Sequence, residues 1–214
     1  MQMIRAVIFD MDGVVTDSER LGFEAITEAG RAQKIDIPHD FIVSTMGMTF
    51  DRSYDMYRKN FPGLDYEKMM RHYYAYMADL AAKGRMPLMK GVREMLDALD
   101  EKKLPRALAS SSRGEIVRAY LESNGIYARF TRIISGEMCA HSKPDPEIFL
   151  TAAGALDVKP EDCLVLEDSL NGVRAGRAAG MRVCMIPDMV PYGEKFAPYV
   201  DEVAQSLLDA RRLV

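Results

Sequence analysis

The chain has 214 residues, with 28 basic and 32 acidic side chains and a formal net charge of −4 at pH 7. This length is enough for one large domain, or for a core that carries a smaller insertion. The two signs of charge are interspersed without a basic stripe, so we expect no nucleic-acid partner. No apolar stretch approaches the roughly 20 residues of a membrane span, so we expect no membrane partner and no signal peptide.

Along the chain, the apolar run 6–9 predicts a buried strand, and Asp10, Asp12 and Gly13 follow it directly. Positions i and i+2 of a strand point to the same face, so we expect the two carboxylates to converge. Such like charges are costly unless a cation or a shared proton relieves them. The arrangement favours a nucleophilic carboxylate beside an acid/base carboxylate, with a hard divalent cation between them. An acidic turn that caps the next helix is the alternative.

Residues 19–86 contain no convincing strand and are rich in Met and Tyr. Within them, residues 67–82 have the apolar spacing of one long helix. Its apolar stripe consists of Met70, Tyr73, Tyr74, Met77, Leu80 and Ala81. We interpret this stripe as core packing, with a substrate surface or a dimer contact as alternatives. The economical interpretation of the whole segment is a helical insertion after the first strand.

From residue 88 onward, short apolar runs alternate with helical patterns. The predicted strands are residues 107–109, 133–134, 163–166 and 183–186. Predicted helices lie near residues 92–99, 116–121, 146–155 and 169–179. Such alternation predicts an α/β fold with a parallel sheet that helices cover on both faces.

Polar motifs follow these predicted strands, at the edge where open α/β sheets bind ligands. They are Asp10 and Asp12, Ser110, Lys143, and the pair Glu167-Asp168. Taken singly, Ser110 fits a helix cap, Lys143 a solvated loop charge, and the acidic pair a helix first turn. Their joint occurrence at strand-to-helix transitions favours one common site.

Cys139, Cys163 and Cys184 are odd in number and lack C-x-x-C spacing. We interpret them as reduced, buried thiols of a cytoplasmic protein, with redox or metal chemistry as the alternative. A monomer is the default expectation for the oligomeric state.

In four motifs the chain resembles the haloacid dehalogenase-like hydrolase superfamily, and within it the β-phosphoglucomutase-like group. The motifs are D-x-D-G at Asp10, a small hydroxylic residue at Ser110, a loop lysine at Lys143 and E-D at Glu167. The resemblance covers nearly the whole chain. It implies a Rossmann-like core of residues 1–17 and 87–214 and an inserted helical cap of residues 18–86.

The resemblance also implies the role of each motif residue. Asp10 resembles the nucleophile that forms an aspartyl-phosphate, and Asp12 resembles the acid/base. Ser110, with backbone N–H groups around Ser111, and Lys143 resemble the groups that bind the phosphoryl oxygens. The Mg²⁺ ligands that it implies are Asp10, Asp12 through its carbonyl, Glu167 and Asp168.

At two positions, the chain departs from the pattern of the group's mutases. Mutases of the group carry a His on the first cap helix, whose position here is Gly22. They carry an Arg after a cap glycine, whose position here is Phe50, although Arg52 lies nearby. We therefore predict a Mg-dependent phosphatase that acts on a small phosphorylated metabolite, specifically a sugar phosphate. A phosphosugar mutase is the second candidate, after the phosphatase. A non-catalytic phosphometabolite-binding protein is the third, although every catalytic position is filled.

Overall fold

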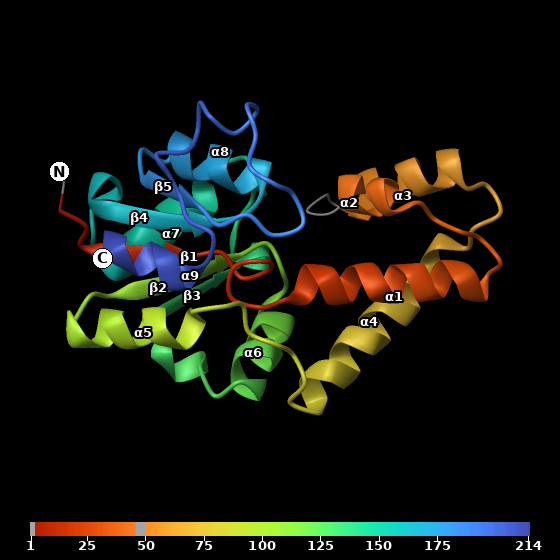
Figure 1. Cartoon of the computed structure of the whole chain (residues 1–214), viewed down its shortest axis with the longest axis horizontal. Coiled ribbons are helices and arrows are strands. Elements are labelled where there is room, and N and C mark those ends of the chain that lie inside the picture. The colour runs from red at the N-terminus through yellow and green to blue at the C-terminus, as the bar shows by residue number, and fades with distance from the viewer. Residues whose placement is uncertain (1–2, 46–49) are drawn as a thin grey trace.

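The computed structural model describes residues 3–45 and 50–214, and its centre is one parallel sheet between two layers of helices (Figure 1). The strand order is β3-β2-β1-β4-β5-β6, and every pairing is parallel. The strands are β1 (Ala6–Phe9), β2 (Arg106–Ser110), β3 (Arg132–Ser135), β4 (Cys163–Glu167), β5 (Arg182–Met185) and β6 (Glu202–Val203). The predicted α/β class is confirmed.

Alternate residues of each central strand pack into different hydrophobic clusters, because successive side chains point to opposite faces of a sheet. Val7 and Phe9 of β1 belong to a cluster with α5 (Val92–Glu101) and α6 (Gly114–Ser123). Ala6 and Ile8 belong to a second cluster. It contains residues of α7 (Glu147–Leu156) and α8 (Leu170–Ala178). Burial on both faces explains why these strands read as continuous apolar runs.

The segment after β1 is helical and lies at one end of the molecule (Figure 1). Its helices are α1 (Ser18–Ala32), α2 (His39–Thr45), α3 (Phe50–Asn60) and α4 (Tyr66–Ala82). Part of it packs into a hydrophobic cluster of its own, centred on Ile42, Tyr57 and Met69. The division into a core of residues 1–17 and 87–214 and a cap of residues 18–86 stays a prediction.

The predicted stripe of α4 is mostly core. Met77, Leu80 and Ala81 are buried, and Tyr73 packs partly buried against the same cluster. The placement of Tyr74 in this core is wrong, since 49% of its surface is exposed. Its ring lies edge-on to that of Tyr73, with centroids 5.2 Å apart, at the solvent border of the stripe.

The sequence pattern does not predict β6 or the short helix α9 (Leu207–Ala210). β6 has two half-buried residues, which is too short for an apolar pattern to show. Within the described ranges, no helix is long and apolar enough to span a membrane.

Candidate active site

The carboxyl ends of three adjacent strands bring polar side chains into the interior. Asp10 follows β1, Ser110 ends β2 and Glu167 ends β4. All three residues are buried. The Asp10 N–H donates to the carbonyl of Leu166 at 2.9 Å, which continues the pairing of β1 with β4 beyond the end of the strand. The parallel register therefore fixes where the Asp10 carboxylate lies.

Lys143 joins these strands from a loop before α7. Its Nζ donates to Oδ1 of Asp10, to Oε1 of Glu167 at 2.9 Å and to the carbonyl of Ala109 at 3.3 Å. Its side chain is only 7% exposed. The ammonium also lies 4.8 Å from the ring centroid of Phe149, a cation–π distance. These contacts satisfy the buried charge on several sides, as burial of an ammonium requires.

Burial and charge act in opposite directions on this network. Burial raises the pKa of Asp10 to about 8; Lys143 opposes this rise, and Glu167 and Asp12 add to it. Burial alone would lower the pKa of Lys143, but Asp10 and Glu167 outweigh it and raise the pKa above its ordinary value. The ammonium therefore stays charged, whereas burial and the neighbouring carboxylates disfavour the charged form of Asp10.

Asp12 has different partners from Asp10. Its Oδ1 accepts a hydrogen bond from Ser18 at 2.5 Å. Its Oδ2 accepts one from Ser112 at 2.9 Å and a longer one from Ser110 at 3.4 Å. The three hydroxyls orient a half-buried carboxylate beside the more deeply buried Asp10.

An acidic cluster shares Asp10 and Glu167 with this network. One carboxylate oxygen from each of Asp10, Glu167 and Asp168 lies within 4.8 Å of the others, and all three residues are buried. Burial, with the charges of Glu167 and Glu19 next in size, raises the pKa of Asp168 well above its ordinary value. Oxygen ligands at this spacing are the donor set of a hard divalent cation.

The loop after β1 makes room for this cluster. At Gly13, φ is +79°, and an added Cβ would lie 2.5 Å from Oδ2 of Asp168 and 3.1 Å from Oδ2 of Asp188. That Asp188 oxygen is buried without a hydrogen-bond partner. A glycine cradle and an orphaned carboxylate oxygen fit a cation here, so the residues present suit Mg²⁺.

Glu167 is held from a second direction. Its Oε2 accepts hydrogen bonds from the backbone N–H of Ser169 at 2.6 Å and from its hydroxyl at 3.0 Å. The same hydroxyl caps α8 by accepting from the N–H of Gly172 at 3.1 Å. One serine therefore both begins the helix, as predicted, and orients the carboxylate that pairs with Lys143.

Ser111 is exposed after β2, and it lines a small pocket of about 90 Å³ together with Lys143. The remaining residues that line it are Gly136, Cys139, His141, Ser142 and Ile148. An added Cβ on Gly136 would lie 2.3 Å from the carbonyl oxygen of Ser111, so a glycine is required where these two loops meet.

The structure thus brings every predicted site residue to one sheet edge. The sequence motifs do not include Ser18, Ser112, Glu19 and Asp188, which the structure adds to this region. Asp188 follows β5, so the rule that polar residues after strands share an edge would have found it. Ser112 belongs to the serine run 110–112, which was itself a signal.

Mutases of the group carry a His at the position of Gly22 and an Arg at that of Phe50, and the structure describes the surroundings of the first position only. At Gly22, an added Cβ would lie 2.9 Å from the Tyr73 ring and 3.5 Å from its hydroxyl, so Tyr73 occupies this space. The side chains of Phe50 and Arg52 lie outside the described residues.

Comparison with known proteins agrees with this arrangement. The family model "Haloacid dehalogenase-like hydrolase" matches residues 7–186. Hexitol phosphatase B of Escherichia coli (strain K12) is 33% identical over 189 residues, which cover 87% of this chain and 85% of the relative. The β-phosphoglucomutase of Bacillus subtilis (strain 168) is 33% identical over 190 residues, which cover 83% and 81%.

A solved structure extends the likeness to three dimensions. CbbY from Rhodobacter sphaeroides, as a mutant in complex with xylulose-(1,5)bisphosphate, matches with a TM-score of 0.79 and 26% identity. The match covers 97% of this chain and 96% of CbbY. The family match spans β1 to β5 and includes the residues gathered at the sheet edge. The chain therefore belongs to the haloacid dehalogenase-like hydrolase family, as the four motifs indicate.

Proposed function

We propose that this protein is a Mg²⁺-dependent phosphatase that hydrolyses a small sugar phosphate through an aspartyl-phosphate on Asp10. The observation that carries the proposal is the position of Asp10, which pairs with Lys143 and lies beside a separately oriented Asp12. A nucleophile and an acid/base with different partners can perform different tasks. The names of the hexitol phosphatase and the bisphosphate-bound CbbY support a sugar phosphate as the substrate.

In the first step, a carboxylate oxygen of Asp10 attacks phosphorus and the ester P–O bond breaks. The leaving oxygen takes a proton from Asp12. In the second step, water attacks phosphorus, Asp12 accepts its proton, and the acyl phosphate bond breaks to release inorganic phosphate and the free Asp10 carboxylate. Ser110 and Lys143 hold the phosphoryl oxygens, and the three hydroxyls around Asp12 keep its carboxylate oriented in both steps.

Asp10, Glu167, Asp168 and the carbonyl of Asp12 would hold the Mg²⁺. When bound, the ion supplies positive charge that reduces repulsion between Asp10 and an anionic phosphate. Two unit charges 4 Å apart interact by about 4 kcal/mol at an effective dielectric near 20, so Lys143 alone offsets one such repulsion. The excess of carboxylates over ammonium in this cluster supports the need for a cation.

The filled space above Gly22 favours hydrolysis over mutase chemistry. A mutase of the group carries a His at this position, whereas here the Tyr73 ring takes the room that such a side chain would need. A phosphosugar mutase is the alternative because the relative from Bacillus subtilis bears that name. A cytoplasmic location and a monomeric state are further predictions.

The test is phosphate release from hexose, hexitol and pentose phosphates with Mg²⁺, repeated with EDTA and with Asp10→Asn. We expect turnover that EDTA abolishes and that falls by at least about 10⁴-fold in Asp10→Asn, since the nucleophile is lost. Asp157→Asn is the matched control, because it makes the same change at an exposed helix end.

Three outcomes distinguish the candidates. Turnover that survives in Asp10→Asn would contradict an aspartyl-phosphate on Asp10. Conversion of β-glucose 1-phosphate to glucose 6-phosphate without phosphate release would identify the mutase. Binding of phosphosugar without either reaction would identify a non-catalytic protein.

A further inference from the structure

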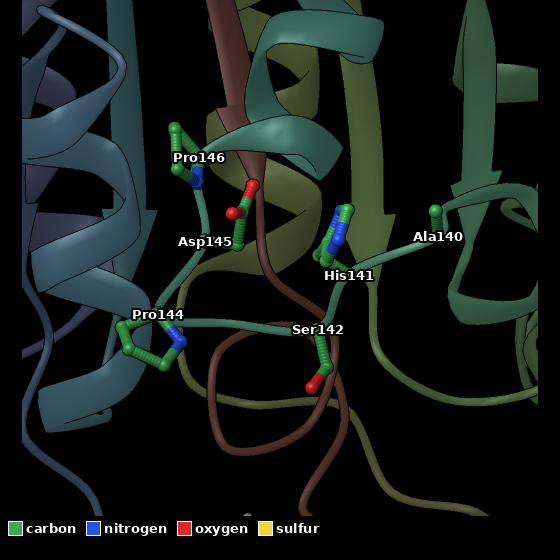
Figure 2. A pocket seen from close by; sticks show the side chains of 6 residues that line it. All are labelled: Ala140, His141, Ser142, Pro144, Asp145 and Pro146. Carbon is green, nitrogen blue, oxygen red and sulfur yellow. The ribbon is translucent and has the colours of Figure 1, made fainter.

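Lys143 lies on a short turn whose backbone is mostly at the surface. The carbonyl of Ser142 accepts a hydrogen bond from the N–H of Asp145 at 3.1 Å, so residues 142–145 form a turn around Lys143. Ala140, His141 and Ser142 are exposed, although the Lys143 side chain is buried. An open pocket of about 630 Å³ adjoins this turn (Figure 2). Core packing therefore does not hold residues 140–142, which lead into the turn and are called here the incoming arm of the loop.

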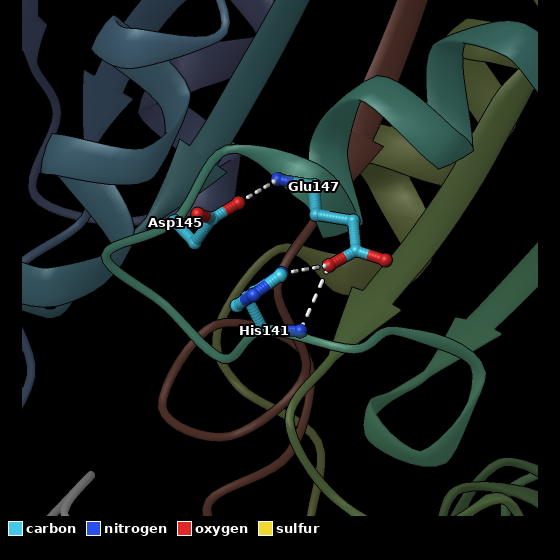
Figure 3. Close-up of side chains that lie close together, drawn as sticks. All are labelled: His141, Asp145 and Glu147. Atoms are coloured by element: carbon cyan, nitrogen blue, oxygen red, sulfur yellow. Dashed lines mark hydrogen bonds and ion pairs between the residues drawn. The ribbon is translucent and has the colours of Figure 1, made fainter.

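Hydrogen bonds to Glu147 hold that arm instead (Figure 3). Its Oε1 accepts from the N–H of Ala140 at 2.9 Å, and its Oε2 accepts from the N–H of His141 at 2.8 Å. The Nδ1 of His141 lies 3.0 Å from the same Oε2. These backbone bonds, above all, lower the pKa of Glu147 below its ordinary value, so it is ionised at neutral pH.

The outgoing arm of the loop, residues 144–146, leads from the turn into α7. It also makes a hydrogen bond to Glu147. The backbone N–H of Glu147 donates to Oδ1 of Asp145 at 2.9 Å (Figure 3). Glu147 thus contacts both arms, one through its side chain and the other through its main chain. Its carboxylate oxygens and Oδ1 of Asp145 are already accepting hydrogen bonds, which explains the cluster of His141, Asp145 and Glu147 without a ligand.

We propose that Glu147 is a positioning residue, which acts through Lys143 because its carboxylate fixes the incoming arm of the loop that delivers the ammonium to Asp10. This inference rests on the proposed function, because the ammonium matters only if Asp10 accepts a phosphoryl group. Glu147 itself touches none of the predicted reacting groups. A displacement of about 1 Å at a reacting group can lower the rate by roughly 100-fold, so a loop anchor of this kind affects catalysis without touching substrate.

The test measures kcat and KM for Glu147→Ala and Glu147→Gln with the substrate found by phosphate release. We expect kcat to fall by about 10–100-fold in Glu147→Ala. Glu147→Gln keeps one acceptor oxygen and gives an intermediate value. His141→Ala leaves both backbone N–H bonds in place, so its kcat falls less than that of Glu147→Ala.

Two controls separate positioning from a general loss of stability. Glu94→Ala removes an exposed glutamate from the first turn of α5, away from this loop, and keeps wild-type kcat. Lys143→Met gives the background for a double-mutant cycle. If Glu147 acts through Lys143, then Glu147→Ala causes no further loss of kcat in the Lys143→Met protein.

Amide hydrogen exchange tests the anchor independently of turnover. In Glu147→Ala, we expect faster exchange at residues 140 and 141 and unchanged exchange in the second half of α7. Unchanged exchange at 140 and 141, a kcat equal to that of Glu94→Ala, or an undiminished loss in the Lys143→Met background overturns the inference. If the wild-type protein releases no phosphate, the proposed function is overturned instead. Amide exchange at residues 140 and 141 then tests only whether Glu147 anchors the loop.

Discussion

Glu167 lies directly against the backbone of α8. An added Cβ on Gly172 would lie 1.6 Å from Oε1 of Glu167 and 1.8 Å from its Cδ. The same carboxylate pairs with Lys143 and accepts two hydrogen bonds from Ser169. The absence of a side chain at Gly172 is therefore what lets a buried carboxylate reach the ammonium, so this glycine is part of the site.

Gly172→Ala tests this close fit. We expect Glu167 to be displaced, kcat to fall by roughly 100-fold, and the free energy of unfolding to drop by about 1–3 kcal/mol through overpacking. Kinetics and thermal unfolding measure the two effects.

Gly154→Ala is the matched control, because it is also a helical glycine and has nothing within 4 Å of the added Cβ. We expect it to keep full activity and to gain up to about 1 kcal/mol in stability. Equal behaviour of the two variants would contradict the role given to Gly172.

The site residues that the sequence predicts and those that it does not predict differ in the interactions that fix their positions. Asp10 and Glu167 follow from the register of buried parallel strands, which an apolar pattern reveals. Ser18 reaches Asp12 through the turn at residues 11–16, where backbone N–H groups bond to Met11 and Thr16. Such loop hydrogen bonds have no periodic signal, so the sequence does not predict them.

At the scale of elements, the longer strands were predictable and the two-residue edge strand β6 was not. β4 and β5 are apolar on both faces and were found almost to the residue, whereas β6 has two half-buried residues and no pattern. Tyr74 shows the same limit on a helix, since spacing alone does not locate the solvent border of an apolar stripe.

β4 and β5 also carry two of the three cysteines, Cys163 and Cys184. Burial raises the pKa of Cys163 to about 11 and that of Cys184 to about 12. All three cysteines are free, and Cys139 alone of these three is half-buried. At pH 8 we therefore expect an aromatic disulfide reagent to label one thiol of the native protein and all three after unfolding.

Time-resolved absorbance measures this labelling, and Cys139→Ser should remove the early phase. Early reaction of Cys163 or Cys184 in the native protein would contradict the burial of β4 and β5.

At the scale of the whole molecule, stability is tied to the acidic cluster. Asp10, Glu167 and Asp168 are gathered in the interior only when the chain is folded, and Lys143 brings one positive charge to them. A ligand that binds the folded state and not the unfolded state stabilises the fold by mass action. A cation that occupies this cluster should therefore stabilise every element that the sheet connects.

Thermal unfolding with Mg²⁺ and with EDTA tests this coupling. A cation at about 100 times its Kd adds about 2.7 kcal/mol, which corresponds to a rise in Tm of roughly 5–10 °C for a chain of this size. We expect Asp168→Asn to lose most of this rise and Asp157→Asn to keep it. An equal rise in both variants would place the cation elsewhere.

The interior position of β1 has a consequence for the chain during synthesis. β1 precedes both of its neighbours, and the gap before β4 exceeds 150 residues. On the ribosome, Asp10 therefore leaves the exit tunnel long before the segments that carry Lys143, Glu167 and Asp168. A nascent chain therefore holds Asp10 without Lys143, Glu167 and Asp168, so the arrangement that we propose for phosphoryl transfer forms only when translation has passed β4.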